Sequence, residues 1–173
     1  MLRVIEIPIA ANAVKLLCYI PEAFVAGLAC LTFVGIRPAW KRMALFGVVY
    51  GSSIFLLRDL ILPWLGSPLG VHTVILFMIN AFLLGLFFGL NLPGSLICAF
   101  LYFLVLIITE PFVILLFNNL VGITLATILE SVWLSILFNS LSLSLVFIFV
   151  ILLRKGNFTL LPITKLIRDE KDV

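Results

Sequence analysis

The chain has 173 residues, of which 64% are hydrophobic and only 11% charged, and its net charge is +3. Soluble domains carry roughly 25% charged residues, so this composition excludes an ordinary soluble enzyme and a nucleic-acid-binding domain. It predicts one all-α, integral membrane helical bundle that has the lipid bilayer as its surroundings.

Residues 1–16 contain acidic, basic and proline residues that interrupt any signal-peptide core, so we predict an interfacial N-terminal segment. The first transmembrane span is predicted over Leu17–Ile36. Pro21 and Glu22 then fall in its first turns, where a proline is tolerated and an acid meets the positive end of the helix dipole. The alternative joins residues 1–16 to this span as one longer first helix.

A short basic loop follows the first span. Gly35–Arg42 reads GIRPAWKR and places three basic residues around a proline and an interfacial tryptophan. The second span is predicted over 43–57, with an extension to residue 65 left open. Arg58 and Asp59 follow the shorter version of this span directly.

The third and fourth spans are predicted over Val71–Leu92 and Gly94–Phe117, joined by a tight turn at the proline between them. The fourth run corresponds to about 36 Å of helix, enough to cross a hydrocarbon core of about 30 Å. Its one ionisable residue is Glu110, followed by Pro111. A charged, unpaired carboxylate there costs on the order of 3 kcal/mol, so Glu110 is expected to face protein or water.

Residues 118–130 are predicted to be a loop with a short surface helix, and the fifth span covers Ser131–Leu153. The domain organisation is thus an interfacial segment over 1–16, a transmembrane domain over 17–153 and a short cytoplasmic tail over 154–173. Six spans are the alternative to five. One face of the fifth span carries Ser131, Ser135, Asn139 and Ser142, which fits either hydrogen bonding between helices or a polar lining.

Basic residues orient the spans, because cytoplasmic loops carry an excess of Lys and Arg. With the C-terminus inside, the cytoplasmic side holds eight basic residues, Arg37, Lys41, Arg42, Arg154, Lys155, Lys165, Arg168 and Lys171, against three outside, Arg3, Lys15 and Arg58. We therefore predict a multi-pass protein of a bacterial cell membrane with its N-terminus outside.

In this orientation six ionisable groups from different segments gather on the outer side, namely Glu22, Arg58, Asp59, His72, Glu110 and Glu130, and Trp64 and Trp133 lie there as an aromatic belt. One interpretation is interfacial solvation with a structural ion pair between Arg58 and Glu110. The other is an outward-facing pocket for an unknown small ligand or peptide, lined by Glu22, Arg58, His72 and Glu110. No metal site or cofactor is expected, and Cys18, Cys30 and Cys98 are interpreted as small packing residues.

Small residues spaced four apart predict close helix packing. They occur as Ala23 with Gly27, Gly47 with Gly51, and Ala81 with Gly85 and Gly89. Packing within the chain is the main interpretation, and a homodimer is the alternative.

Catalytic signatures are lacking in the sequence: it has one histidine and no H-E-x-x-H or G-x-S-x-G pattern, so we expect no enzyme. The strings IPEAF (Ile20–Phe24), GIRPAWKR (Gly35–Arg42), LLRDLILPWLGSPLGVHT (Leu56–Thr73) and ITEPF (Ile108–Phe112) resemble the N-terminal multi-span membrane domains of Firmicutes sensor histidine kinases with GHKL-type ATPase domains.

The resemblance implies a sensor-like membrane domain that binds a ligand or partner on the outer side and signals through a cytoplasmic partner protein. The residues after Leu153 leave no room for a kinase, so a stand-alone domain without kinase activity is expected. A substrate-binding subunit of a vitamin-type transporter and a structural membrane protein without a ligand are the two alternatives.

Overall fold

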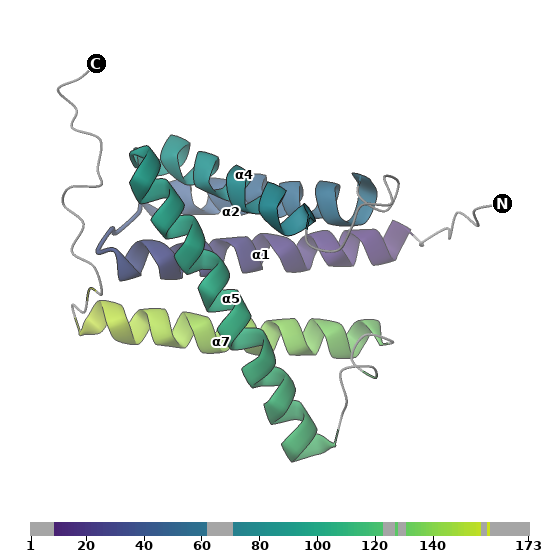
Figure 1. The fold of residues 1–173 in the computed structure, drawn as a ribbon. Helices are drawn as coiled ribbons and strands as arrows, with labels where there is room; N and C mark the ends of the chain where they lie inside the picture. Colours follow the sequence, from purple (N-terminus) through teal and green to yellow (C-terminus); the bar gives the residue numbers. More distant parts are fainter. Residues whose placement is uncertain (1–8, 62–70, 123–126, 128–130, 157–158, 160–173) are drawn as a thin grey trace.

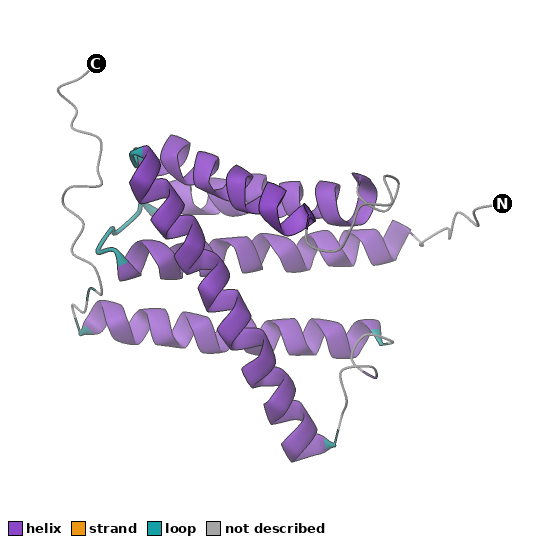
Figure 2. Cartoon of the chain, in the orientation of Figure 1, coloured by secondary structure: helices purple, strands orange, loops and turns teal. Residues whose placement is uncertain are grey.

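The computed structural model describes residues 9–61, 71–122, 127, 131–156 and 159. These residues form almost entirely helices, as Figure 2 shows. In chain order the elements are α1 (Ile9–Phe33), α2 (Trp40–Phe55), a π-helical turn η1 (Leu56–Ile61), α4 (Val71–Phe88), α5 (Leu92–Val121) and α7 (Val132–Lys155). Five helices in the described part are long and apolar enough to cross a membrane, which confirms the predicted five-span bundle.

Helix α1 is the centre of the bundle. It lies between α2 on one side and α7 on the other, while α5 crosses the bundle obliquely and diverges towards its own C-terminal end (Figure 1). In the apolar stretch of α1 that is long enough to cross a membrane, 56% of the residues are buried within the protein. The corresponding share is 17% for α5 and for α7. The outer helices instead turn large apolar side chains outward, for example Phe82 and Trp133, as a lipid-facing surface requires.

The predicted glycine positions bring α1 and α2 into close contact. A Cβ atom on Gly51 would lie 2.7 Å from Cα of Ile20, and one on Gly47 would lie 3.0 Å from Cβ of Phe24. Gly85 has the same role between α4 and α5, because its Cβ would lie 2.9 Å from Oγ of Ser95. These glycines therefore act in packing within the chain.

Gly89 was expected to take part in this packing, but no atom lies within 4 Å of the position of its Cβ. Its φ of 65° instead ends α4 in the left-handed region. Asn91 then caps α5 by accepting a hydrogen bond from the Gly94 backbone N–H at 2.9 Å. A proline follows in the first turn of the helix, where its missing N–H leaves no hydrogen bond unmade.

Several helix boundaries differ from the sequence prediction; α4, for example, ends at Phe88 rather than at Leu92. Helix α1 begins at Ile9 rather than at residue 17, so the longer first helix is the one that forms, with Pro21 inside it. Helix α5 continues through Pro111 to Val121, into the predicted loop over 118–130. The short surface helix expected in this loop would involve residues 123–126 and 128–130, which lie outside the described residues.

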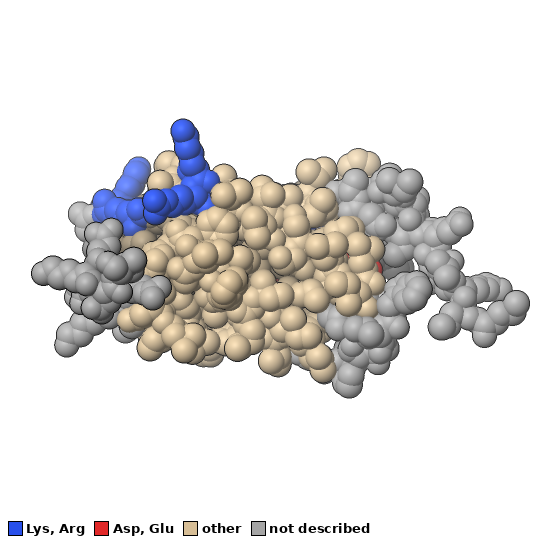
Figure 3. Space-filling model, turned by 90° about the horizontal axis from the view of Figure 1, so that it is seen from above, with Lys and Arg blue, Asp and Glu red and all other residues tan. Residues whose placement is uncertain are grey.

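Basic side chains gather at one end of the bundle (Figure 3). They come from the α1–α2 loop, the start of α2 and the end of α7, and they are Arg37, Lys41, Arg42, Arg154 and Lys155. We call this the basic end. Lys15, Arg58, Asp59 and His72 belong to the opposite end, where α1 and α4 begin and η1 lies.

Candidate functional site

A cavity of about 90 Å³ lies between α1, α5 and α7, and two carboxylates from different helices line it. Its polar lining consists of Glu22 from α1, Thr109 and Glu110 from α5, and Asn139 and Ser142 from α7. The apolar lining consists of Leu106, Phe138, Leu143 and Val146. We call this space the carboxylate cavity.

The two acids reach this cavity from the middle of long helices. Glu22 lies about halfway along α1 because that helix begins well before the position expected from the sequence, and its side chain is half-buried. Glu110 is more exposed, on the part of α5 that diverges from the bundle (Figure 1). The neighbouring Thr109 hydroxyl donates to the carbonyl of Val105. Pro111 has no N–H, so the α5 backbone lacks one hydrogen bond beside Glu110.

Helix α7 contributes an amide and a hydroxyl group on one face. Ser142 is 8% exposed, and its hydroxyl has no hydrogen-bond partner in the described part of the chain. Asn139 lies within hydrogen-bonding reach of the Cys18 thiol. On the opposite face the exposed Ser144 hydroxyl donates back to the carbonyl of Ser140 at 2.7 Å. The polar face predicted for the fifth span thus turns Asn139 and Ser142 towards α1 and α5.

A more apolar groove of about 290 Å³ adjoins the carboxylate cavity. It lies between the first half of α1 and the start of α7, and it is lined by Val14, Leu17, Cys18, Pro21, Ile136, Asn139, Ser140 and Leu143. Asn139 and Leu143 border both spaces. A molecule with a polar head and an apolar body could therefore occupy the two together.

Arg58 lies in η1, with its guanidinium carbon 6.0 Å from the centre of the Tyr19 ring. It is close enough to act electrostatically on both Glu22 and Glu110. Among the described residues, the direct ion pair at this end is between Lys15 and Asp59, with Lys15 Nζ 2.6 Å from Asp59 Oδ1. Arg58 and Glu110 form no direct ion pair in the described part of the chain.

His72 is half-buried at the second position of α4 and does not line the carboxylate cavity. Of the four predicted site residues, the structure thus brings Glu22 and Glu110 together, with Arg58 nearby and His72 apart. Glu130 and Trp64, predicted for the same side, lie outside the described residues.

Sequence reasoning did not place Thr109 at the site, and it missed the Lys15–Asp59 pair. Thr109 precedes the acid of α5 and gave no signal of its own. The Lys15 pair was missed because residues 1–16 were interpreted as interfacial; once α1 includes them, Lys15 lies two turns before Glu22, on the same face.

The polar lining of the cavity supplies mainly acceptor oxygens, which come from two carboxylates, an amide and hydroxyl groups. Comparisons of the chain with protein-family models, with curated proteins and with solved structures find no match. The resemblance to sensor domains of histidine kinases therefore stays a prediction.

Proposed function

We propose that this protein is a non-catalytic, receptor-like membrane domain that binds an amphiphilic ligand with a cationic group and passes a signal to a partner protein. The observation that carries the proposal is the shared cavity of Glu22 and Glu110. Within the described part of the chain no Lys or Arg forms a direct ion pair with either acid.

The energetics favour a cationic ligand. A charged carboxylate in the hydrocarbon region costs on the order of 3 kcal/mol, and two that share one cavity also repel each other. An ammonium group between Glu22 and Glu110 would offset both costs, with Asn139 and Ser142 accepting further hydrogen bonds. The adjoining groove would take the apolar part of the ligand.

The cavity also offers a way to couple ligand binding to a partner. A bound ligand would join α1, α5 and α7. Val113 and Phe117 of α5 already pack against Phe138, Leu141 and Leu145 of α7. Because α7 continues from the cavity to the basic end, a shift of α7 would move Arg154 and Lys155. A cytoplasmic partner that contacts the basic end would receive that shift.

The proposal is tested with the full chain in detergent, using n-octylammonium as the probe and n-octanol as its uncharged match. Thermal unfolding is followed with increasing probe. We expect octylammonium to raise the unfolding midpoint of the wild type and octanol to leave it unchanged. Glu22→Gln and Glu110→Gln should each weaken the apparent affinity by about tenfold, which is about 1.4 kcal/mol.

Ser144→Ala serves as the matched control, since this residue faces away from the cavity on the same helix. Its response to octylammonium should equal that of the wild type. An equal response of both glutamine variants and the wild type, or equal stabilisation by octanol, would contradict a carboxylate-based site.

A further inference from the structure

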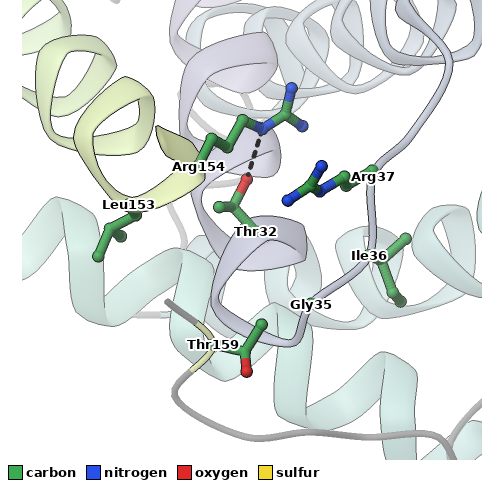
Figure 4. Close-up of a pocket in the computed structure, with 7 residues that line it drawn as sticks. All are labelled: Thr32, Gly35, Ile36, Arg37, Leu153, Arg154 and Thr159. Carbon is green, nitrogen blue, oxygen red and sulfur yellow. Dashed lines mark hydrogen bonds between the residues drawn. The ribbon is translucent and has the colours of Figure 1, made fainter. Parts of the chain in front are cut away.

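Two guanidinium groups meet in a small pocket at the basic end. Arg154 comes from the end of α7 and Arg37 from the loop after α1, and Figure 4 shows both directed towards the same space beside the Thr32 hydroxyl. The remaining lining residues are Gly35, Ile36, Leu153 and Thr159. An anion that binds between two positively charged groups is stabilised by both of them.

Two contacts hold the Arg154 side chain in place, and they leave one of its guanidinium nitrogens without a hydrogen-bond partner among the described residues. Its Nε donates to Oγ1 of Thr32 at 3.2 Å, and its guanidinium carbon lies 5.7 Å from the centre of the Trp40 ring. The Thr32 hydroxyl donates its own proton to the Leu28 carbonyl at 2.7 Å, so its oxygen accepts from Arg154. Nη2 of Arg154 is buried and has no hydrogen-bond partner within the described residues. A buried donor of this kind is costly unless a ligand satisfies it.

The turn that carries Arg37 is equally well defined. Gly35 has a φ of 81°, its N–H donates to the Thr32 carbonyl at 3.0 Å, and the Ile36 N–H donates to the Leu31 carbonyl at 2.8 Å. This is the Schellman pattern at a helix C-terminus. It fixes the direction of the chain into Arg37.

The pocket encloses about 20 Å³. Roughly 10–15 Å³ is enough for one water-sized group, so the pocket would take one oxygen of an anion while the rest of the anion stays outside. Planar guanidinium groups suit phosphate oxygens in particular, because they offer paired N–H donors.

An apolar groove of about 220 Å³ begins at the same arginine. Arg154 and Lys155 border it at the basic end, and the rest of its lining is Leu28, Trp40, Phe147, Val150 and Ile151. The groove therefore runs from the charged end along α7 towards the hydrocarbon region. An acyl chain has the right shape and polarity for it.

From this arrangement we propose a binding site for an anionic phospholipid, with a phosphate oxygen between Arg37 and Arg154 and an acyl chain in the groove beside Ile151. The groove distinguishes the lipid from free phosphate, which would leave it empty. The net charge distinguishes an anionic from a zwitterionic lipid, whose ammonium group would meet Lys155 and its basic neighbours. Basic pockets between transmembrane helices bind anionic headgroups in this way. The site is separate from the carboxylate cavity and does not depend on the proposed function.

The test uses the full chain in detergent and native mass spectrometry, which counts bound lipids. The probes are phosphatidylglycerol, phosphatidylcholine of the same acyl length, and inorganic phosphate. We expect phosphatidylglycerol to stay bound at least about tenfold more tightly than phosphatidylcholine, as expected for a pair of charge-assisted contacts. Arg37→Gln and Arg154→Gln should each remove most of that preference. Ile151→Trp should fill the groove and weaken lipid binding, although both arginines remain.

Arg42→Gln is the matched control, because Arg42 is exposed at the same end but lines neither the pocket nor the groove. It should bind phosphatidylglycerol as the wild type does. Arg37 is exposed on a loop, so its variant should fold even where Arg154→Gln does not. Equal binding of the two lipids would overturn the site. So would an equal loss in the Arg42 variant, or full displacement of the lipid by inorganic phosphate.

Discussion

Helix α1 meets α2 and α7 in two contrasting ways. Against α2 its backbone comes so close that Gly51 has no room for a Cβ atom. Against α7 it leaves the carboxylate cavity and two further spaces, at Cys18–Pro21 and at Leu28. The sequence of α7 explains the difference, since it contains no glycine and no alanine between Val132 and Lys155.

The two contacts of α1 differ both in how closely the helices pack and in where polar groups lie. Small residues allow α1 and α2 to form a rigid pair, whereas the bulky side chains of α7 hold it away from α1. Polar groups collect where the packing is loose: Glu22, Asn139 and Ser142 near the middle of the bundle, and Arg154 at the basic end. Both proposed binding sites lie on the α7 side of α1.

The largest effect is expected from Gly51→Ala. The new methyl group would lie 2.7 Å from Cα of Ile20 and 2.8 Å from its backbone nitrogen. Because backbone atoms on both helices must move apart, we expect a loss of about 3 kcal/mol in the free energy of unfolding, at the upper end of overpacking costs. Reversible unfolding in mixed detergent measures it.

Two controls sharpen this comparison. Gly156→Ala adds a methyl group at ordinary contact distance and should leave stability nearly unchanged. Ser140→Leu adds a larger side chain, but into the open groove between α1 and α7, and should cost less than Gly51→Ala. A larger loss for the serine variant would mean that the α7 side is the tighter one.

A smaller loss is expected from Lys15→Met at the end where η1 lies. Asp59 is 11% exposed and accepts from Lys15 at 2.6 Å, while its Oδ2 has no partner in the described region. Removing the lysine leaves a largely buried carboxylate without its cation, so we expect a loss of about 2 kcal/mol in unfolding free energy. The double variant Lys15→Met with Asp59→Asn should recover part of it. No coupling between the two sites in such a cycle would show that this pair does not hold η1 against α1.

The helix number and the close helix packing at Gly47 and Gly51 could be predicted because they depend on local signals, namely apolar length and the spacing of small residues. The start of α1 could not. Pro21 and Glu22 are typical of a first turn, yet α1 runs through both, and Pro21 faces the groove beside α7. A proline within a transmembrane helix is tolerated where neighbouring helices compensate.

Part of the site was predictable for a similar reason. An acid in an apolar run stands out, so Glu22 and Glu110 could be named. Which residues face these acids depends on the rotation of each helix about its axis. The sequence indicates how far along its helix a residue lies, but this height does not determine the rotation. His72 was therefore included although it lies apart, and Thr109 was missed although it lines the cavity.

The smallest effect concerns Ser142, and its sign separates the two faces of α7. The buried Ser142 hydroxyl has no partner among the described residues, whereas the Ser144 hydroxyl bonds to the Ser140 carbonyl. Removing an unsatisfied buried hydroxyl relieves a cost, so Ser142→Ala should raise the free energy of unfolding by about 1 kcal/mol. Ser144→Ala should change it by less than about 0.5 kcal/mol, as for other surface substitutions.

With octylammonium bound, the gain in stability from Ser142→Ala should disappear, because the Ser142 hydroxyl is then needed as an acceptor. A gain that persists unchanged with the probe would show that Ser142 takes no part in the cavity.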